Sequence, residues 1–227
     1  MIELRAYRLA GFADVCRAPG IRHSGYGRYH DDGSLPTHYF ALHPLGPLAE
    51  LARKDGLRTW DDMLETEARV WAVRVIIQKS DDLLVVTPSN AMTTLGVEPF
   101  ALIDDAYSEC QRVAQAGRDN IDTAKIWQVP SAALPGTDNL VIFGDRQGID
   151  YDVKITDPDY EIAACVVADR AMPPLEFMSC IRTKGDTRHR DFEERVRRGE
   201  SFTFRQPIFN YFRVDHGLPL PEGPLAG

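Results

Sequence analysis

Short apolar runs of strand length recur along most of the chain, and they limit its fold more than any other feature of the sequence. Residues 2–9 alternate apolar and polar side chains, which is the period of a half-buried strand. Further runs of strand composition lie at residues 37–42, 70–78, 83–86, 125–129, 140–143 and 151–155. Turns rich in Pro, Gly and Ser separate several of them. The chain is therefore expected to be rich in strands.

Four segments have the spacing of helices instead. Apolar residues within 45–52 recur at helical intervals, and Gly56 follows them as a helix-ending residue. Helical patterns also follow Pro88 and occupy residues 104–116. A strongly charged segment, residues 187–198, predicts an exposed helix with a solvated face. Strands with helices inserted between them predict an α+β fold.

The length and the net charge limit the classes of protein that remain. The 227 residues suffice for one large domain, or for one domain with an extension. Lys and Arg number 26 against 34 Asp and Glu, so no overall positive field attracts a nucleic acid. From about residue 157 the chain contains several prolines and no sequence motif that we can identify. We therefore expect one domain over residues 1–156 and a C-terminal extension, residues 157–227, packed on it.

The cysteines and the hydrophobic segments indicate where the protein works. Cys16, Cys110, Cys165 and Cys180 are far apart, which favours reduced thiols over a disulfide framework. The N-terminus is charged from its third residue and lacks the apolar stretch of a signal peptide. No run approaches the roughly 20 apolar residues that a membrane helix needs. A cytoplasmic protein without a membrane partner is expected.

Several common catalytic motifs are absent from the sequence. Neither GxGxxG nor GxxxxGKS occurs, which argues against Rossmann and P-loop nucleotide sites, and GxSxG is missing as well. The histidines His23, His30, His38 and His43 crowd one part of the chain, but they have no neighbouring cysteine and no HExxH motif. We interpret them as solvated loop histidines and expect no metal site.

Residues with useful chemistry lie in three separated segments. Arg28 and Tyr29 follow Gly27 in a loop, Tyr39 precedes Glu50 by eleven residues, and Ser131 follows a Val-Pro pair. An arginine can bind a pyrophosphate through two hydrogen bonds, and an aromatic ring can stack on a flat cation. A carboxylate can stabilise positive charge that develops on a sugar. Together these groups favour cleavage of the glycosidic bond of NAD.

Each of these residues also has an ordinary explanation. Glu50 precedes Lys54 by four residues on the expected helix, so an exposed ion pair worth about 0.3 kcal/mol could account for it. Arg28 could be solvated, and Tyr39 could be a core residue of its strand. Ser131, after a proline, could simply form a turn. Only the joint pattern favours a site.

The combination and order of these segments resemble the RES family, which is named for an Arg, a Glu and a Ser. The resemblance rests on the Tyr-Arg-Leu at residues 7–9, on GRYHDDGSLPTHYFALHPLGPLAEL at 27–51 and on VPSAALPGTDNLVIF at 129–143. It implies a β-rich core like that of the ADP-ribosyltransferases. Members of the family are commonly toxins of bacterial toxin–antitoxin pairs that attack NAD.

The resemblance also assigns roles to three catalytic residues. Arg28 takes the position of the family's Arg and would grip a phosphate of NAD. Glu50 takes the position of the Glu and would stabilise the oxocarbenium-like ribose as nicotinamide departs. Ser131 takes the position of the Ser, where its hydroxyl would hydrogen-bond the ribose or the nicotinamide amide.

Further contacts with NAD follow from the same resemblance. Tyr29 and Tyr39 fall on aromatic positions of the family and would frame the nicotinamide ring. Arg8, at the end of the first expected strand, is a weaker candidate for binding the co-substrate. The sequence after residue 157 matches no motif of the family, so it leaves the choice of acceptor open.

The expected function is therefore that of a type II toxin that uses NAD as its co-substrate and arrests growth. It would act as a mono-ADP-ribosyltransferase on a cellular protein, such as phosphoribosyl pyrophosphate synthetase, which one branch of the family modifies. The alternatives are an NAD glycohydrolase or phosphorylase, and a module that binds NAD or ADP-ribose without catalysis. The family also implies a cognate antitoxin protein that covers the cleft, and no direct nucleic-acid partner.

Overall fold

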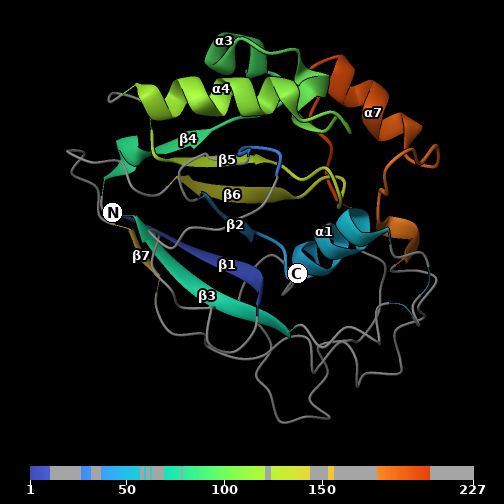
Figure 1. The fold of residues 1–227 in the computed structure, drawn as a ribbon, viewed down its shortest axis with the longest axis horizontal. Coiled ribbons are helices and arrows are strands. Elements are labelled where there is room, and N and C mark those ends of the chain that lie inside the picture. The colour runs from blue at the N-terminus through green and yellow to red at the C-terminus, as the bar shows by residue number, and fades with distance from the viewer. Residues whose placement is uncertain are drawn as a thin grey trace.

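Seven strands form one mixed sheet in the computed structural model (Figure 1). The structure describes residues 1–10, 27–31, 37–56, 59, 62, 69–77, 79–120, 124–143, 153–155 and 178–204. The strands are β1 (Ile2–Ala10), β2 (Thr37–Ala41), β3 (Arg69–Ile77), β4 (Leu83–Val85), β5 (Ile126–Pro130), β6 (Asp138–Phe143) and β7 (Val153–Ile155). Their order is β4-β5-β6-β2-β1-β3-β7. Only β4 and β5 pair in parallel, and all the other pairs are antiparallel.

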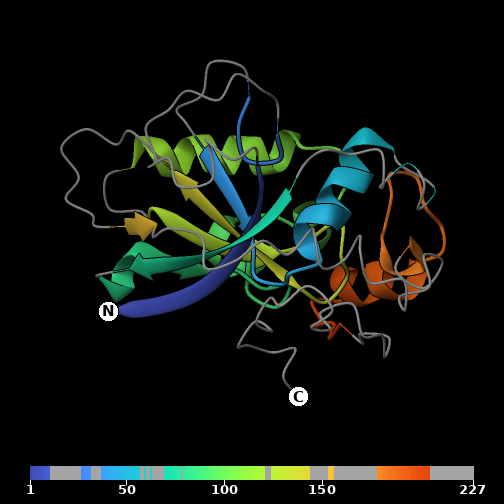
Figure 2. The ribbon, with the colours of Figure 1, turned by 90° about the horizontal axis from the view of Figure 1, so that it is seen from below.

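Helices cover one half of this sheet and one of its ends. The α-helices are α1 (Gly46–Asp55), α3 (Ala91–Leu95), α4 (Ser108–Asp119) and α7 (Arg190–Arg197), and the 3-10 helices are η1 (Ser80–Asp82) and η2 (Pro99–Leu102). Helices α3 and α4 lie above β4, β5 and β6 in Figure 1, and α7 packs against η2. Figure 2, seen from below, places α1 and α7 at the same end of the sheet. The predicted α+β class is confirmed.

Both faces of β6 are buried, which explains the continuous apolar run that predicted this strand. Leu140 and Ile142 belong to one hydrophobic cluster, together with Phe40 and Val75. Val141 and Phe143 point to the other face and join the cluster under α3 and α4. There the ring of Phe143 meets that of Trp127 edge to face, with centroids 4.9 Å apart. Strand β6 is therefore a central strand that anchors both layers.

The two predicted helix ends differ in how closely they match the structure. Helix α1 ends at Gly56, whose φ of 70° is left-handed, as the sequence pattern predicts. Helix α7 begins at Arg190, three residues after the predicted start, and it has a solvated face, as predicted, as well as a buried one. Phe192 and Val196, four residues apart on one face, are buried in the cluster under α3 and α4, on the side where α7 packs against η2. The charged residues of α7 hide this short apolar stripe in the sequence.

Two of the histidines correct the expectation of solvated loop residues. His38 lies within β2 and is only 1% exposed, because its strand is covered on both faces. His43 is also buried, where its Nδ1 accepts a hydrogen bond from the N–H of Leu45 at 3.2 Å. Its ring meets the ring of Phe204 edge to face at 4.9 Å. His23 lies outside the described residues.

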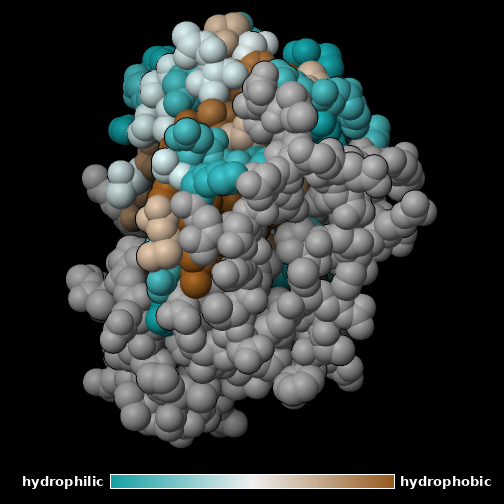
Figure 3. Space-filling view, turned by 90° about the vertical axis from the view of Figure 1, so that its left-hand side faces the viewer, coloured by the Kyte–Doolittle hydropathy of each residue, from teal (hydrophilic) through white to brown (hydrophobic). Residues whose placement is uncertain are grey.

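The surface of the described residues is mainly polar. Among the described residues, the large hydrophobic side chains that are exposed to solvent are those of Met1, Val85 and Met92. On the face in Figure 3, hydrophilic side chains dominate the upper part and hydrophobic ones form a band below it. Cys110 is a buried free thiol, whereas Cys16 and Cys165 lie outside the described residues. Within the described ranges, no helix has both the length and the apolar character needed to span a membrane.

The described part of the expected C-terminal extension contacts the loop between β5 and β6. The N–H of Arg182 donates to the carbonyl of Ala133 at 2.8 Å. The N–H of Phe204 donates to the carbonyl of Gly136 at 3.2 Å. These bonds attach the segment 178–204 to the loop that begins at Ser131, while the boundary at residue 157 stays a prediction.

Gly136 should be among the glycines that tolerate a side chain least. Its φ of 86° is left-handed, and an added Cβ would lie 2.1 Å from the amide nitrogen of Phe204. Gly96 is a matched control, because its φ is 68° but nothing lies within 4 Å of an added Cβ. We expect Gly136→Ala to lower the free energy of unfolding by about 3 kcal/mol or more, against about 1 kcal/mol for Gly96→Ala. Urea denaturation measures both, and equal losses would contradict the contact.

Candidate functional site

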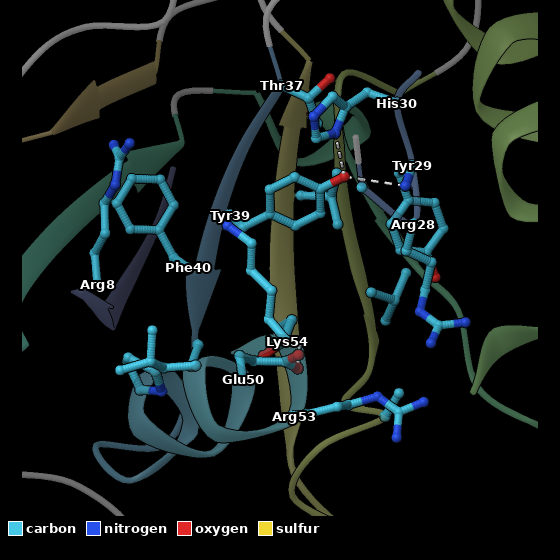
Figure 4. A pocket seen from close by; sticks show the side chains of 18 of the residues that line it. Arg8, Arg28, Tyr29, His30, Thr37, Tyr39, Phe40, Glu50, Arg53 and Lys54 are labelled. Carbon is cyan, nitrogen blue, oxygen red and sulfur yellow. Dashed lines mark hydrogen bonds between the residues drawn. The ribbon is translucent and has the colours of Figure 1, made fainter. Parts of the chain in front are cut away.

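A pocket of about 670 Å³ opens between α1, β2 and the loop that carries Arg28 (Figure 4). This volume lies in the range of small-molecule sites. It is lined by Tyr7, Arg8, Gly27, Arg28, Tyr29, His30, Thr37, Tyr39, Phe40, Ala41, Pro47, Glu50, Leu51, Arg53, Lys54, Tyr107, Val129, Pro130, Ala132, Asn139 and Val141. The lining includes every site residue named from the sequence except Ser131, which lies directly behind Glu50.

Glu50 is held by two neutral donors from other parts of the chain. Its Oε1 accepts hydrogen bonds from Ser131 Oγ at 2.9 Å and from Asn139 Nδ2 at 2.7 Å. Within the described part of the chain, Oε2 accepts no hydrogen bond. The carboxylate is therefore fixed through one oxygen, and the other remains available to a ligand in the pocket.

The exposed ion pair considered for Glu50 does not form. Glu50 is half-buried, and its partners are Ser131 and Asn139 rather than Lys54. Lys54 is exposed at the rim of the pocket, where its side chain extends from α1 toward the ring of Tyr39 in Figure 4. Asn139 lies within the segment 129–143 that carries the family resemblance, but nothing in the sequence is a reason to assign it a role.

Ser131 forms a turn and holds Glu50 at the same time. Its side chain is completely buried, and its Oγ accepts the N–H groups of Ala133 at 3.2 Å and Leu134 at 3.1 Å. The same hydroxyl donates its proton to Glu50. A hydroxyl offers one donor and two acceptor positions, so all three are filled. The geometry thus directs Ser131 toward the carboxylate.

Replacement of Ser131 should destabilise the protein through these contacts. In Ser131→Ala, the buried N–H groups of Ala133 and Leu134 lose their acceptor and Glu50 loses a donor. We expect the free energy of unfolding to fall by about 1–3 kcal/mol. Ser80→Ala, which removes an exposed hydroxyl, should change it by less than about 0.5 kcal/mol. Urea denaturation would contradict this account if the two variants lost the same stability.

Two tyrosines form the wall opposite Glu50. The ring of Tyr29 packs edge to face on Trp127 at 6.0 Å, so it is also a core residue. Tyr39 Oη accepts the N–H of Tyr29 at 3.0 Å and shares a hydrogen bond of 2.8 Å with His30 Nδ1 (Figure 4). Burial raises the pKa of both phenols well above the usual value. Both tyrosines therefore remain protonated at neutral pH and can serve as hydrogen-bond donors.

Arg28 lies against an aromatic ring at one side of the pocket. Its guanidinium lies 4.7 Å from the ring centroid of Tyr107, and its Nη1 donates to the carbonyl of Ala101 at 3.4 Å. Lys184 Nζ lies over the same ring at 5.2 Å. At the opposite side, the guanidinium of Arg8 lies 5.3 Å from the ring centroid of Phe40. Cations therefore border the pocket at both ends.

Arg53 is a lining residue that the sequence did not predict. It is buried, its Nη1 donates to the carbonyl of Arg182 at 3.0 Å, and its Nη2 forms an ion pair with Asp105. Burial lowers the pKa of Arg53. Burial opposes ionisation of Asp105 too, but the N–H of Gly185 and the Arg53 guanidinium outweigh it and lower the pKa of Asp105. A basic residue in the last turn of a helix gives no sequence signal of such burial.

The charge of the pocket lining is unbalanced. Among the described lining residues, Arg8, Arg28, Arg53 and Lys54 are positive and Glu50 is negative, although Arg53 is paired with Asp105 behind the lining. Among the described residues, no group of three or more His, Cys, Asp or Glu side chains is placed to hold a metal ion. The pocket therefore suits an anionic ligand that also has one centre of positive charge for Glu50.

Comparison of the fold relates the chain to a toxin–antitoxin structure. A chain of the MbcT–MbcA toxin–antitoxin complex of Mycobacterium tuberculosis has the same fold, with a TM-score of 0.55 and 19% sequence identity. The match covers 79% of this chain and 89% of that one. No model of a protein family matches the sequence.

A sequence relative gives a more particular likeness. The chain is 34% identical over 134 residues to a probable NAD(+) phosphorylase of M. tuberculosis, strain H37Rv. The match covers 58% of this chain and 56% of the relative, so the chain spans little more than half of that protein. The likeness to NAD-attacking toxins that the sequence motifs predict is confirmed by these comparisons.

Proposed function

We propose that this protein is an enzyme that cleaves the nicotinamide–ribose bond of NAD, with a core of the ADP-ribosyltransferase type. The observation that carries the proposal is the carboxylate of Glu50, which is fixed through Oε1 and presents Oε2 to a pocket lined by cations. NAD offers the matching chemistry, namely a negatively charged pyrophosphate and a ribose that becomes positive as nicotinamide leaves. The name of the NAD(+) phosphorylase relative supports this choice.

Glu50 acts on the developing charge of the ribose. Nicotinamide departs with the electrons of the glycosidic bond and becomes neutral, so the positive charge moves to the sugar. A fixed carboxylate in a partly dehydrated pocket stabilises that charge without reorganisation. Ser131 and Asn139 keep the carboxylate in place, which makes Ser131 a residue that orients Glu50 in this proposal.

The cations bind the two phosphates of NAD. Arg28 takes one phosphate, in the role that the RES resemblance implies, and the buried Arg53 adds a second guanidinium on the same side of the pocket (Figure 4). Tyr39 frames the nicotinamide ring, with Tyr29 behind it. Arg8 lies at the other end of the pocket and contacts the far part of the dinucleotide.

The acceptor of ADP-ribose in this proposal is inorganic phosphate. The name of the relative favours it, and so does the excess of cations over carboxylates in the lining. Phosphate oxygen then bonds to C1 of the ribose as nicotinamide leaves, which gives ADP-ribose 1-phosphate and nicotinamide. Transfer to a protein such as phosphoribosyl pyrophosphate synthetase, and hydrolysis, remain predictions for the same pocket.

The biological setting is part of the proposal. We infer that the protein is the toxin of a toxin–antitoxin pair in the cytoplasm, where loss of NAD arrests growth. A cognate antitoxin that covers the pocket is the expected partner, since a solved structure with the same fold comes from a toxin–antitoxin complex.

The fate of NAD labelled in its adenylate half distinguishes the acceptors. The purified chain is incubated with labelled NAD, inorganic phosphate and a cell extract. Label in ADP-ribose 1-phosphate that depends on added phosphate supports phosphorolysis. Label on a discrete protein band indicates protein modification instead, and label in free ADP-ribose indicates hydrolysis. Label that stays in NAD would contradict an enzyme and favour the module that only binds NAD.

A further inference from the structure

Glu50 and Ser131 meet although they belong to separate segments of the chain. Glu50 lies on α1, and Ser131 begins the loop between β5 and β6, 81 residues later. A single hydrogen bond of 2.9 Å between two side chains does not fix a helix against a loop, because both side chains can rotate. A second connection between these segments would hold the two groups at their working distance.

Arg182 supplies that second connection. Arg53, one turn after Glu50 on α1, donates from Nη1 to the carbonyl of Arg182 at 3.0 Å. The N–H of Arg182 in turn donates to the carbonyl of Ala133 at 2.8 Å, two residues after Ser131. The contacts run from Glu50 through Arg53, Arg182 and Ala133 to Ser131 and close into a ring.

The side chain of Arg182 strengthens this link from within the protein. It is only 4% exposed and forms an ion pair with Glu193 of α7, with Nη2 and Oε1 2.7 Å apart. Its Nη1 donates to the carbonyl of Ile103 at 3.0 Å and approaches that of Ala132 at 3.5 Å. A guanidinium has the fixed geometry needed for these contacts in several directions, which the flexible ammonium of lysine lacks.

Arg182 itself does not line the pocket, so its effect must pass through other residues. Its nearest links to the site are Arg53 and the main chain next to Ser131. Buried ion pairs add little net stability compared with apolar residues of similar size, although they can fix one arrangement over others. The buried charge of Arg182 can therefore serve to fix the relative positions of Glu50 and Ser131 rather than to add stability.

We propose that Arg182, supported by Glu193, is a positioning residue that sets the distance between Glu50 and Ser131. The inference rests on the proposed cleavage of NAD and deepens it, because it assigns part of the site to the segment 178–200. That segment matches no motif in the sequence, yet here it completes the frame of the site. Arg182 acts through the ring of contacts and not on the substrate.

The kinetic test replaces Arg182 by lysine, which keeps the charge and loses the planar fork. We expect Arg182→Lys to lower kcat for nicotinamide release by about tenfold to a hundredfold, since small displacements of catalytic groups have effects of this size. The Kd for NAD, measured by titration calorimetry, should stay within about threefold because the pocket lining is unchanged. Arg188→Lys is the matched control, because Arg188 is in the same segment, is more than half exposed and pairs with Asp186. It should match the wild type.

A second measurement does not depend on activity. The amide hydrogens of Ala133 and Leu134 donate to Ser131 Oγ, so their exchange with solvent reports on the loop. In Arg182→Lys they should exchange at least tenfold faster, whereas the amide hydrogens of α4 should not change. Glu193→Gln keeps an acceptor oxygen and should show a smaller change, which retains the test if Arg182→Lys folds poorly.

The outcomes separate the two ideas. A wild-type chain that releases no nicotinamide overturns the proposed function, and the exchange measurement alone then decides the positioning role. Unchanged exchange in both variants overturns that role. So does an Arg182→Lys variant whose kcat equals that of the wild type, or whose activity falls only in proportion to its unfolded fraction.

Discussion

Glu50→Gln is expected to reduce the rate of nicotinamide release from NAD by about a thousandfold. The substitution keeps the shape of the side chain, and the amide oxygen of Gln can still accept the hydrogen bonds from Ser131 and Asn139. What disappears is the negative charge that, in the proposed mechanism, faces the ribose. Because the charge acts on the transition state and not on the bound NAD, kcat should fall while the Kd for NAD changes little.

The control for this variant is a carboxylate with no role in the pocket. Glu109 on α4 is more than half exposed and pairs with Arg112. Glu109→Gln should therefore release nicotinamide at the wild-type rate. The melting temperature of Glu50→Gln should stay close to that of the wild type, which shows that the fold survives. Full activity in Glu50→Gln would remove Glu50 from the mechanism.

Arg28→Gln should have the second largest effect, and it should act mainly on binding. The guanidinium is placed at the edge of the pocket by the ring of Tyr107 and the carbonyl of Ala101. Loss of a charge-assisted pair with a phosphate is worth about 1.5–3 kcal/mol, or roughly a tenfold to a hundredfold rise in the KM for NAD. Steady-state kinetics at several NAD concentrations separates this rise from any change in kcat.

A surface arginine provides the comparison for Arg28. Arg112 is more than half exposed on α4 and pairs with Glu109, so Arg112→Gln should leave KM unchanged. An equal KM in the wild type and in Arg28→Gln would contradict phosphate binding by Arg28. A fall in kcat at constant KM would instead assign Arg28 to the transition state.

Much of the fold could be predicted from the sequence because burial leaves a local pattern. The run at 140–143 is apolar without a break, and the structure shows why: alternate side chains of β6 enter the two clusters on opposite faces of the sheet. The end of α1 could also be predicted from the sequence, because Gly56 adopts the left-handed conformation in which a glycine commonly ends a helix. Such signals involve neighbours in the sequence.

The partners of the site residues carry no such signal. Glu50 meets Ser131 and Asn139, which are 81 and 89 residues away, so spacing within α1 could not separate this arrangement from an ion pair with Lys54. Only the resemblance of whole segments to a family brought Glu50 and Ser131 together. The structure shows why these distant residues meet. Strand β2 pairs with β6, and this pairing places α1, which follows β2, against the loop between β5 and β6.

The buried arginines were missed for a related reason. Arg53 is followed by Lys54 at the end of α1, where basic residues are normally solvated and favourable to the helix dipole. Its contact with Arg182 joins residues 129 positions apart. Arg182 itself lies in the part of the chain that resembles no motif. A charge buried by tertiary contacts cannot be recognised from its neighbours in the sequence.

The most direct test of the central claim is the release of nicotinamide from NAD by the purified chain. Nicotinamide and NAD are quantified together by chromatography at several times, in the presence of inorganic phosphate. We expect nicotinamide to form in an amount equal in moles to the NAD consumed, and we expect Glu50→Gln to abolish nearly all of this release. NAD that binds saturably but stays intact over many hours, in both wild type and variant, would contradict cleavage and identify a binding module.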